Sequence, residues 1–130
     1  MKELYRDEAV VLRTYRLRES DRIVVLLTKE HGKVRAVAHG VRKTNSKFGG
    51  RLEPMSHVLV QLRRGRELDT VTQVESVDRL GPMLSSLDRT SQGMAAIEAV
   101  EQLALDREPT PQLFRSTVGV LRTIAERPSS

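Results

Sequence analysis

The first eighty residues carry short apolar runs that are separated by polar turns. Residues 8–15 contain the run Ala-Val-Val-Leu, and residues 22–28 contain the run Ile-Val-Val-Leu-Leu. Runs of this length that are rich in β-branched residues are typical of buried strands. Residues 17–21 between them are polar and predict a turn. A second turn is predicted at 29–32, because Gly32 can adopt the positive φ of a hairpin.

Three further strands follow, at residues 33–39, 57–63 and 68–77. Alternate apolar residues in the first two of these predict one buried face each. These residues are Val34, Ala36 and Ala38 in the first, and Val58, Val60 and Leu62 in the second. Five antiparallel strands within about seventy-five residues commonly close as an OB-fold or an SH3-like barrel, because closure removes most exposed strand edges.

The segment between the third and fourth strands, residues 40–53, breaks the alternating pattern. It contains three glycines together with Asn45 and Ser46, which predicts an exposed and mobile loop. Its four cations are Arg42, Lys43, Lys47 and Arg51.

Helical spacing replaces strand alternation after Gly81-Pro82. A helix is predicted at 88–106, and a second is predicted to start at Thr110 as N-cap with Pro111 at the first helical position. Their apolar positions are Met94, Ile97, Val100 and Ala104, then Leu113, Thr117, Val120, Leu121 and Ile124. We therefore predict a barrel domain at 1–80 and the start of a helical domain at 81–130. The two helices either pack on the barrel or begin a helical region whose remainder is missing.

Charge divides the chain at about the same place. Residues 1–66 hold 16 Lys and Arg against 7 Asp and Glu, whereas residues 67–130 hold 6 against 10. A basic region attracts polyanions through counterion release, and nucleic acid is the commonest polyanion inside cells. With aromatic residues at 3%, few side chains are available to stack on bases.

Other classes of protein find little support in the sequence. The absence of cysteine excludes disulfides, thiolate nucleophiles and cysteine-ligated zinc within these residues. The three histidines are scattered, and no phosphate-binding loop or nucleophile elbow is present. The charged N-terminus and the short apolar runs predict an intracellular protein without a signal peptide or a membrane span. We therefore expect no enzymatic activity, no catalytic residue and no metal site.

Several ordered segments resemble the N-terminal region of the bacterial RecO family of recombination mediators. They are LYRDEAVVL at 4–12, DRIVVLLT at 21–28, GKVRAVAHGVRK at 32–43, SKFGGRLEP at 46–54, and the stretches 68–76 and 98–124. The similarity covers nearly the whole chain.

The resemblance implies an N-terminal OB-fold, then a helical region, and often a four-cysteine zinc module further on. It also implies a cytoplasmic, nucleoid-associated protein of DNA repair that binds single- and double-stranded DNA and anneals complementary strands. RecR, RecA and single-stranded-DNA-binding protein (SSB) are its implied partners. This chain is shorter than such proteins, so we expect a fragment, with zinc possible only in a missing C-terminal part.

The candidate contacts to DNA are basic side chains on the barrel and its loops, together with one aromatic residue. They are Lys33, Arg35, Arg42, Lys43, Lys47, Phe48, Arg51, Arg63, Arg64 and Arg66. Tyr15 is a second aromatic that is placed either to stack on a base or to join the core. Arg115 and Arg122 on the second helix are candidate contacts for an acidic peptide.

Two other functions remain open. The basic barrel could instead dock acidic partner proteins and have little DNA affinity of its own. A nuclease is the third possibility, although no clustered metal ligands support it.

Overall fold

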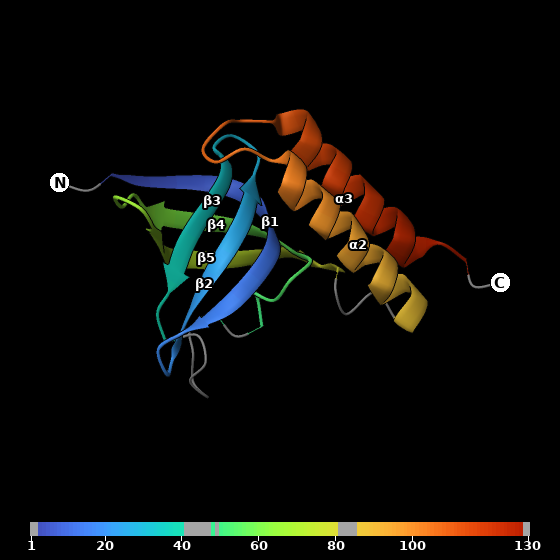
Figure 1. Ribbon diagram of the computed structural model, residues 1–130, viewed down its shortest axis with the longest axis horizontal. Helices are drawn as coiled ribbons and strands as arrows, with labels where there is room; N and C mark the ends of the chain where they lie inside the picture. Colours follow the sequence, from blue (N-terminus) through green and yellow to red (C-terminus); the bar gives the residue numbers. More distant parts are fainter. Residues whose placement is uncertain (1–2, 41–47, 49, 81–85, 129–130) are drawn as a thin grey trace.

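The computed structural model describes residues 3–40, 48, 50–80 and 86–128, and it places five strands before the helices α2 and α3 (Figure 1). The strands are β1 (Leu4–Leu17), β2 (Asp21–Thr28), β3 (Gly32–Ala38), β4 (Ser56–Arg63) and β5 (Asp69–Arg79), and the helices are α2 (Leu87–Leu103) and α3 (Pro111–Glu126). All five predicted strands are confirmed. The prediction for β1 was too short at both ends, and the prediction for α2 ran past its end at Leu103.

The five strands close into a barrel in the order β1-β2-β3-β5-β4, with β1 also paired to β4. The predicted antiparallel sheet is corrected to a mixed one, because β5 returns beside β3 in parallel. That pairing is short and joins Ala36 to Asp69 and Val37 to Thr70. This closed sheet is consistent with the predicted OB-fold.

Alternate residues of every strand fill the barrel interior, as the sequence pattern predicts. The interior cluster consists of Ala9, Val11, Val24, Leu26, Ala36, Ala38, Phe48, Leu52, Val58, Val60, Leu62 and Val71. Most of these side chains are small aliphatic groups, and they fill the barrel interior with little help from aromatic rings.

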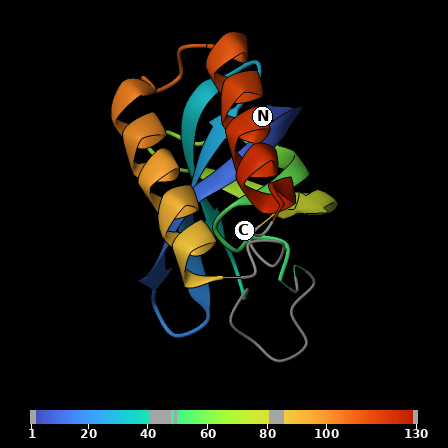
Figure 2. The same cartoon turned by 90° about the vertical axis from the view of Figure 1, so that its right-hand side faces the viewer.

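A second apolar core joins the barrel to the helices, which lie side by side against it (Figure 2). Strand β1 supplies both cores, because Ala9 and Val11 point inward while Val10 and Leu12 point outward. The outward residues meet Ile97 of α2, along with further side chains of both helices. The helices therefore pack on the barrel, as the first of the two alternatives proposed. The division into two domains at residue 80 stays a prediction.

The predicted apolar face of α3 is confirmed except at Val120: Leu113 and Ile124 also pack, partly buried, against the second core. Phe114, Thr117 and Leu121 are its buried residues, whereas Val120 is 47% exposed. Thr110 is the N-cap and Pro111 begins the helix, as predicted, although the Thr110 side chain makes no capping hydrogen bond. Its ψ of 71° lies outside the extended region that a capping residue adopts.

A β-bulge in β1 changes which side chains face outward. Val11 pairs with Leu26 and Arg13 pairs with Val25, so that Leu12 is the extra residue. Simple alternation from Val11 would place Tyr15 inside the barrel. Because the bulge shifts the alternation by one residue, Tyr15 lies outside and is 39% exposed.

The connection between α2 and α3 runs back over the start of β3 (Figure 1). The backbone N–H of Lys33 donates to Leu105 O at 3.1 Å, and the N–H of Arg107 donates to Lys33 O at 3.0 Å. These bonds use a part of the β3 edge that β5 does not reach. The connection therefore ties the helical hairpin to the barrel.

Gly32 allows this close approach. Its φ is +72°, and a Cβ at this position would lie 2.3 Å from the carbonyl oxygen of Glu108. We expect Gly32→Ala to destabilise the protein by about 2 kcal/mol or more, because it adds both backbone strain and a clash with backbone. Urea unfolding measures this cost. Gly119→Ala is the matched control, since nothing lies within 4 Å of a Cβ there and alanine favours the helix by roughly 0.5–1 kcal/mol. Equal stability of the two variants would contradict the proposed packing.

Candidate nucleic-acid interface

Barrels of this type bind oligonucleotides on the outer face of β2 and β3, between the β1–β2 and β4–β5 loops. In this protein the sheet register places Tyr15, Ile23 and Val37 in one row across that face. Residues directly opposite one another in neighbouring strands share a face of the sheet. The row therefore forms an apolar strip with one exposed aromatic ring, and we call it the β2–β3 strip.

Arginines surround the β1–β2 turn at one end of the strip. Arg16 and Arg22 are paired in the register, and Arg18 lies in the turn with a φ of +57°. Arg16 and Arg18 are exposed, and Arg18 pairs with Asp21 at 3.2 Å. Arg22 lies 3.8 Å from the carboxylate of Glu53. This end of the barrel is consequently rich in cations.

Asp21 organises the same turn. Its carboxylate accepts a hydrogen bond from the backbone N–H of Gly40 at 2.8 Å and lies 3.2 Å from His39 Nδ1. The bond from Gly40, with smaller effects of His39 and Arg18, lowers the pKa of Asp21 to about 2. An ionised Asp21 therefore fixes the end of β3 against the β1–β2 turn at neutral pH.

The β4–β5 loop forms the other end of the strip. Arg66 is exposed in this loop, and it has no ion-pair partner within the described part of the chain. The guanidinium of Arg64 stacks 4.9 Å from the ring centroid of Tyr5 and pairs with Glu3 at 3.5 Å. The Arg64 side chain is therefore held partly by contacts within the barrel, whereas the Arg66 side chain is free to reach a ligand.

A buried carboxylate braces this loop. Asp69 is fully buried and accepts two hydrogen bonds from Arg107, at 2.7 and 2.9 Å. It also accepts bonds from the N–H of Gly65 and from the hydroxyl of Tyr5. Burial alone would raise the pKa of Asp69, but these bonds outweigh it and lower the pKa below its ordinary value. Burial and the bond to Asp69 raise the pKa of Tyr5.

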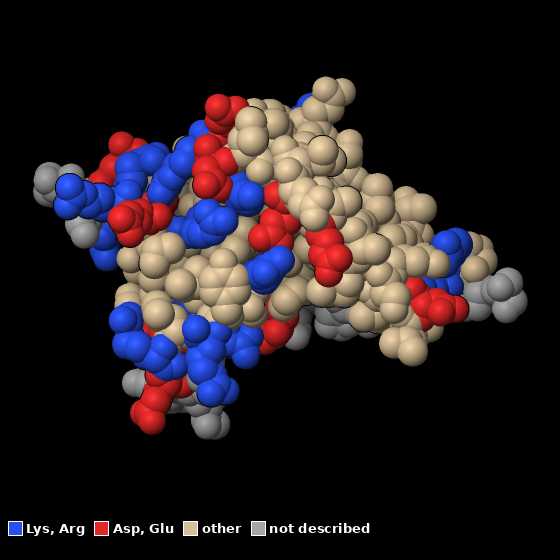
Figure 3. Space-filling model, in the orientation of Figure 1, with Lys and Arg blue, Asp and Glu red and all other residues tan. Residues whose placement is uncertain are grey.

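Lys and Arg side chains gather in two groups at the barrel end of the molecule, separated by uncharged surface (Figure 3). The helical end carries fewer charges in the same view. This separation agrees with the division of charge along the sequence.

Two predicted contacts on β3 are engaged by the helical hairpin. The ammonium of Lys33 donates to the carbonyl of Glu101 at 3.0 Å, and its side chain is only 13% exposed. Arg35 pairs with Asp106 at 3.3 Å but stays 41% exposed. The bond to Tyr15, with smaller effects of Asp106, raises the pKa of Arg35. Arg35 thus borders the β2–β3 strip, while Lys33 mainly holds α2.

The remaining predicted cations do not form one surface. Arg63 lies on the outer face of β4 beside Leu59 and Gln61, away from the strip, because it alternates with buried Leu62. Arg51 is exposed. Arg42, Lys43 and Lys47 lie outside the described residues, as does most of the predicted mobile loop.

Phe48 is corrected from a stacking residue to a core residue. It is 1% exposed inside the barrel, and Leu52 beside it is 3% exposed. The N–H of Arg51 donates to Phe48 O at 3.1 Å. The end of the predicted loop is therefore anchored by apolar burial, and Phe48 has no free face for a base.

The two helix arginines differ in their surroundings. Arg122 pairs with Asp78 of β5 and, at 3.3 Å, with Glu126, and the bond to Asp78 raises its pKa. Arg115 is exposed, without an ion pair to any residue that the structure describes. Arg122 therefore helps to hold α3 on the barrel, which leaves Arg115 as the candidate for an acidic peptide.

Arg16, Arg18 and Arg22 were missing from the predicted site. The signal was present, because all three flank a turn between two predicted strands, and a five-stranded barrel binds through that turn. The 40–53 loop holds four cations and three glycines, and it therefore gave the stronger signal in the sequence.

Among the described residues, no group of His, Cys, Asp and Glu is arranged to hold a metal ion. In the same part of the chain, no helix has the length and apolar character that a membrane crossing needs.

A comparison with protein families agrees with the geometry. The family model described as the N-terminal part of recombination protein O matches residues 1–80, which are the barrel and all five strands. This family consists of non-enzymatic mediators of recombination and DNA repair. The chain belongs to the RecO family.

Proposed function

We propose that this protein binds DNA through the β2–β3 strip and the two arginine-bearing turns beside it. The observation that carries the proposal is the placement of Arg16, Arg18, Arg35 and Arg66 around that strip, on a barrel of the RecO family. Arginine is well suited to phosphate, since its guanidinium donates several hydrogen bonds in a fixed plane.

Phosphate contacts supply most of the affinity in this proposal. A base stacked on an aromatic ring contributes roughly 1–3 kcal/mol, and Tyr15 is the exposed ring on the strip within the described residues. Contacts to phosphate carry no direct sequence information. Binding is therefore indifferent to sequence and accepts both single strands and duplex, which suits a protein that holds two strands while they pair.

Because the chain belongs to the RecO family, we also propose two more specific activities for it. They are annealing of complementary strands and, together with RecR, the loading of RecA onto DNA covered by SSB.

The test is fluorescence anisotropy of a labelled single-stranded oligonucleotide across a salt series. If four phosphates are neutralised, the slope of log affinity against log salt is roughly −3, since each contact contributes about −0.7. Oligonucleotides of different sequence should give similar values. No salt-sensitive binding even at low ionic strength would contradict the proposal. In that case, binding of an acidic peptide would favour a protein-docking module instead.

A further inference from the structure

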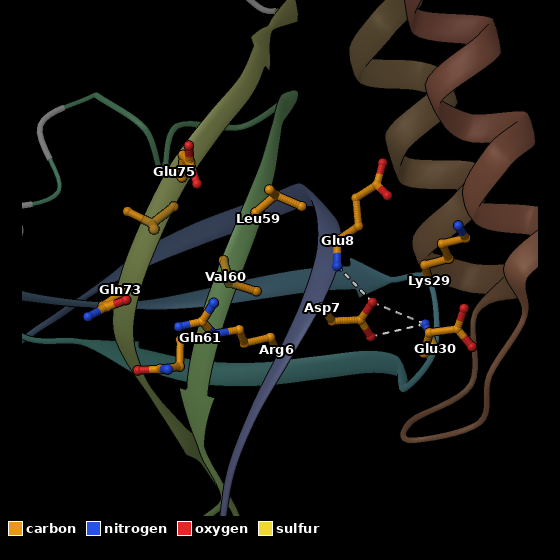
Figure 4. Close-up of a pocket in the computed structure, with 11 residues that line it drawn as sticks. Arg6, Asp7, Glu8, Lys29, Glu30, Leu59, Val60, Gln61, Gln73 and Glu75 are labelled. Carbon is orange, nitrogen blue, oxygen red and sulfur yellow. Dashed lines mark hydrogen bonds between the residues drawn. The ribbon is translucent and has the colours of Figure 1, made fainter.

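A hollow of about 400 Å³ lies on a part of the barrel that the proposed DNA surface does not use (Figure 4). Strands β1, β4 and β5 form most of it, and the β2–β3 turn closes one side. The side chains that line it are Arg6, Asp7, Glu8, Lys29, Glu30, Leu59, Val60, Gln61, Gln73, Val74 and Glu75.

The sheet register explains why an apolar side chain is exposed in the hollow. Leu59 of β4 is paired with Glu8 on β1 and with Glu75 on β5. Leu59 is 44% exposed, although the residues on either side of it, Val58 and Val60, are buried in the barrel. The hollow thus presents a leucine between two carboxylates.

The charge of the hollow is opposite to that of the barrel as a whole. Asp7 is satisfied internally, since it accepts from the N–H of Glu30 at 3.0 Å and lies 2.6 Å from His31 Nδ1. Glu8 lies 2.6 Å from His57 Nε2. The carboxylates of Glu30 and Glu75 have no hydrogen-bond or ion-pair partner within the described part of the chain. Arg6 and Lys29 also line the hollow, so the four carboxylates Asp7, Glu8, Glu30 and Glu75 outnumber its two cations. This excess of carboxylates beside an exposed leucine favours a basic, partly apolar ligand over phosphate.

We propose that this hollow docks a segment of a partner protein that presents an arginine or lysine next to an apolar side chain. The apolar group packs on Leu59, and the cation pairs with Glu75, which lies beside Leu59 in the sheet. The segment docks by its side chains, because β4 at the centre of the hollow is paired on both edges, to β1 and to β5.

The hollow and the β2–β3 strip draw on different surfaces of the barrel. The strip uses β2, β3 and the second half of β1, whereas the hollow uses β4, β5 and the first half of β1. DNA and a docked protein segment can therefore occupy the chain together.

The test uses the full chain labelled with ¹⁵N and a synthetic peptide that alternates arginine and leucine. The expected result is a set of amide shift changes centred on Glu8, Leu59 and Glu75, and no such change with a peptide that has glutamate in place of arginine. Shift changes confined to the β2–β3 strip, equal binding of both peptides, or no binding at millimolar peptide would overturn the proposal. Shift changes at Glu8, Leu59 and Glu75 on addition of an oligonucleotide alone would also overturn it, by assigning the hollow to DNA.

Two variants test the same contacts by affinity. Glu75→Lys and Leu59→Ser are each expected to weaken the arginine peptide on the order of three- to tenfold, while oligonucleotide binding is retained. Glu98→Lys, an exposed charge reversal on α2, is the matched control and should leave the peptide affinity unchanged. If all three variants bind the peptide equally, the hollow is not the docking site.

Discussion

Replacing Asp69 with alanine is expected to destabilise the protein by about 2–4 kcal/mol. Removing one partner of a fully buried ion pair costs about 3–5 kcal/mol, because the other charge is left without compensation. We expect somewhat less here, since the Arg107 side chain retains 34% exposure to water. The variant also removes the acceptor for Tyr5 and Gly65. Urea unfolding at neutral pH measures the difference.

The same pair predicts how stability depends on pH. The pKa of Asp69 in the folded protein is below its ordinary value of 3.8, so folding favours the ionised carboxylate. The contribution is complete above pH of about 4 and is lost as the pH falls through the lowered folded pKa. The gap in stability between the parent and Asp69→Ala should therefore shrink in acid.

Glu67→Ala is the control, because Glu67 is an exposed carboxylate two residues away. Its effect should stay within about 0.5 kcal/mol, as for most surface substitutions. A double-mutant cycle with Arg107→Ala isolates the pair, and we expect a coupling energy of roughly 1–3 kcal/mol. A coupling energy near zero would show that Asp69 and Arg107 do not brace the β4–β5 loop.

The second large effect concerns DNA affinity. Replacing Arg16, Arg18, Arg35 and Arg66 together with glutamine should flatten the salt slope by about 2–3 and weaken binding roughly 100-fold at 0.1 M salt. All oligonucleotide sequences should be weakened about equally, because phosphate contacts are being removed. The barrel should still fold, since none of the four side chains belongs to either apolar core.

A second fourfold variant, which removes the same number of positive charges, is compared with the first. It replaces Arg42, Lys43, Lys47 and Arg51, the cations that the sequence placed in the 40–53 loop. If this variant loses the slope and the first variant keeps it, DNA binds at the loop and not at the β2–β3 strip. Arg115→Gln on α3 should leave the slope unchanged.

The barrel was predictable because its strands follow simple alternation. Val58, Val60 and Leu62 all lie in the interior as predicted, and so do Ala36 and Ala38. Each strand end was placed to within a few residues, since turns and glycines mark the boundaries. The basic first half of the chain likewise predicted the gathering of Lys and Arg side chains at the barrel end of the molecule (Figure 3).

Other features depend on how distant segments meet. Tyr15 faces outward because of the bulge at Leu12. The residues around Leu12 form no sequence pattern that predicts a bulge. The partner of Asp69 is Arg107, which lies 38 residues away in the connection between the helices. Phe48 follows a lysine in a polar segment, yet the barrel interior takes it up. The sequence shows that each of these residues is present, but the contact that gives each residue its role forms only when the chain folds.

DNA is proposed to lie along the β2–β3 strip, and an amide shift map of the ¹⁵N-labelled chain with a short oligothymidine tests this placement. The largest changes are expected at Tyr15, Ile23 and Val37 and in the two flanking turns, and these changes should disappear as salt is added. Changes confined to α2 and α3, or to the hollow around Leu59, would contradict it.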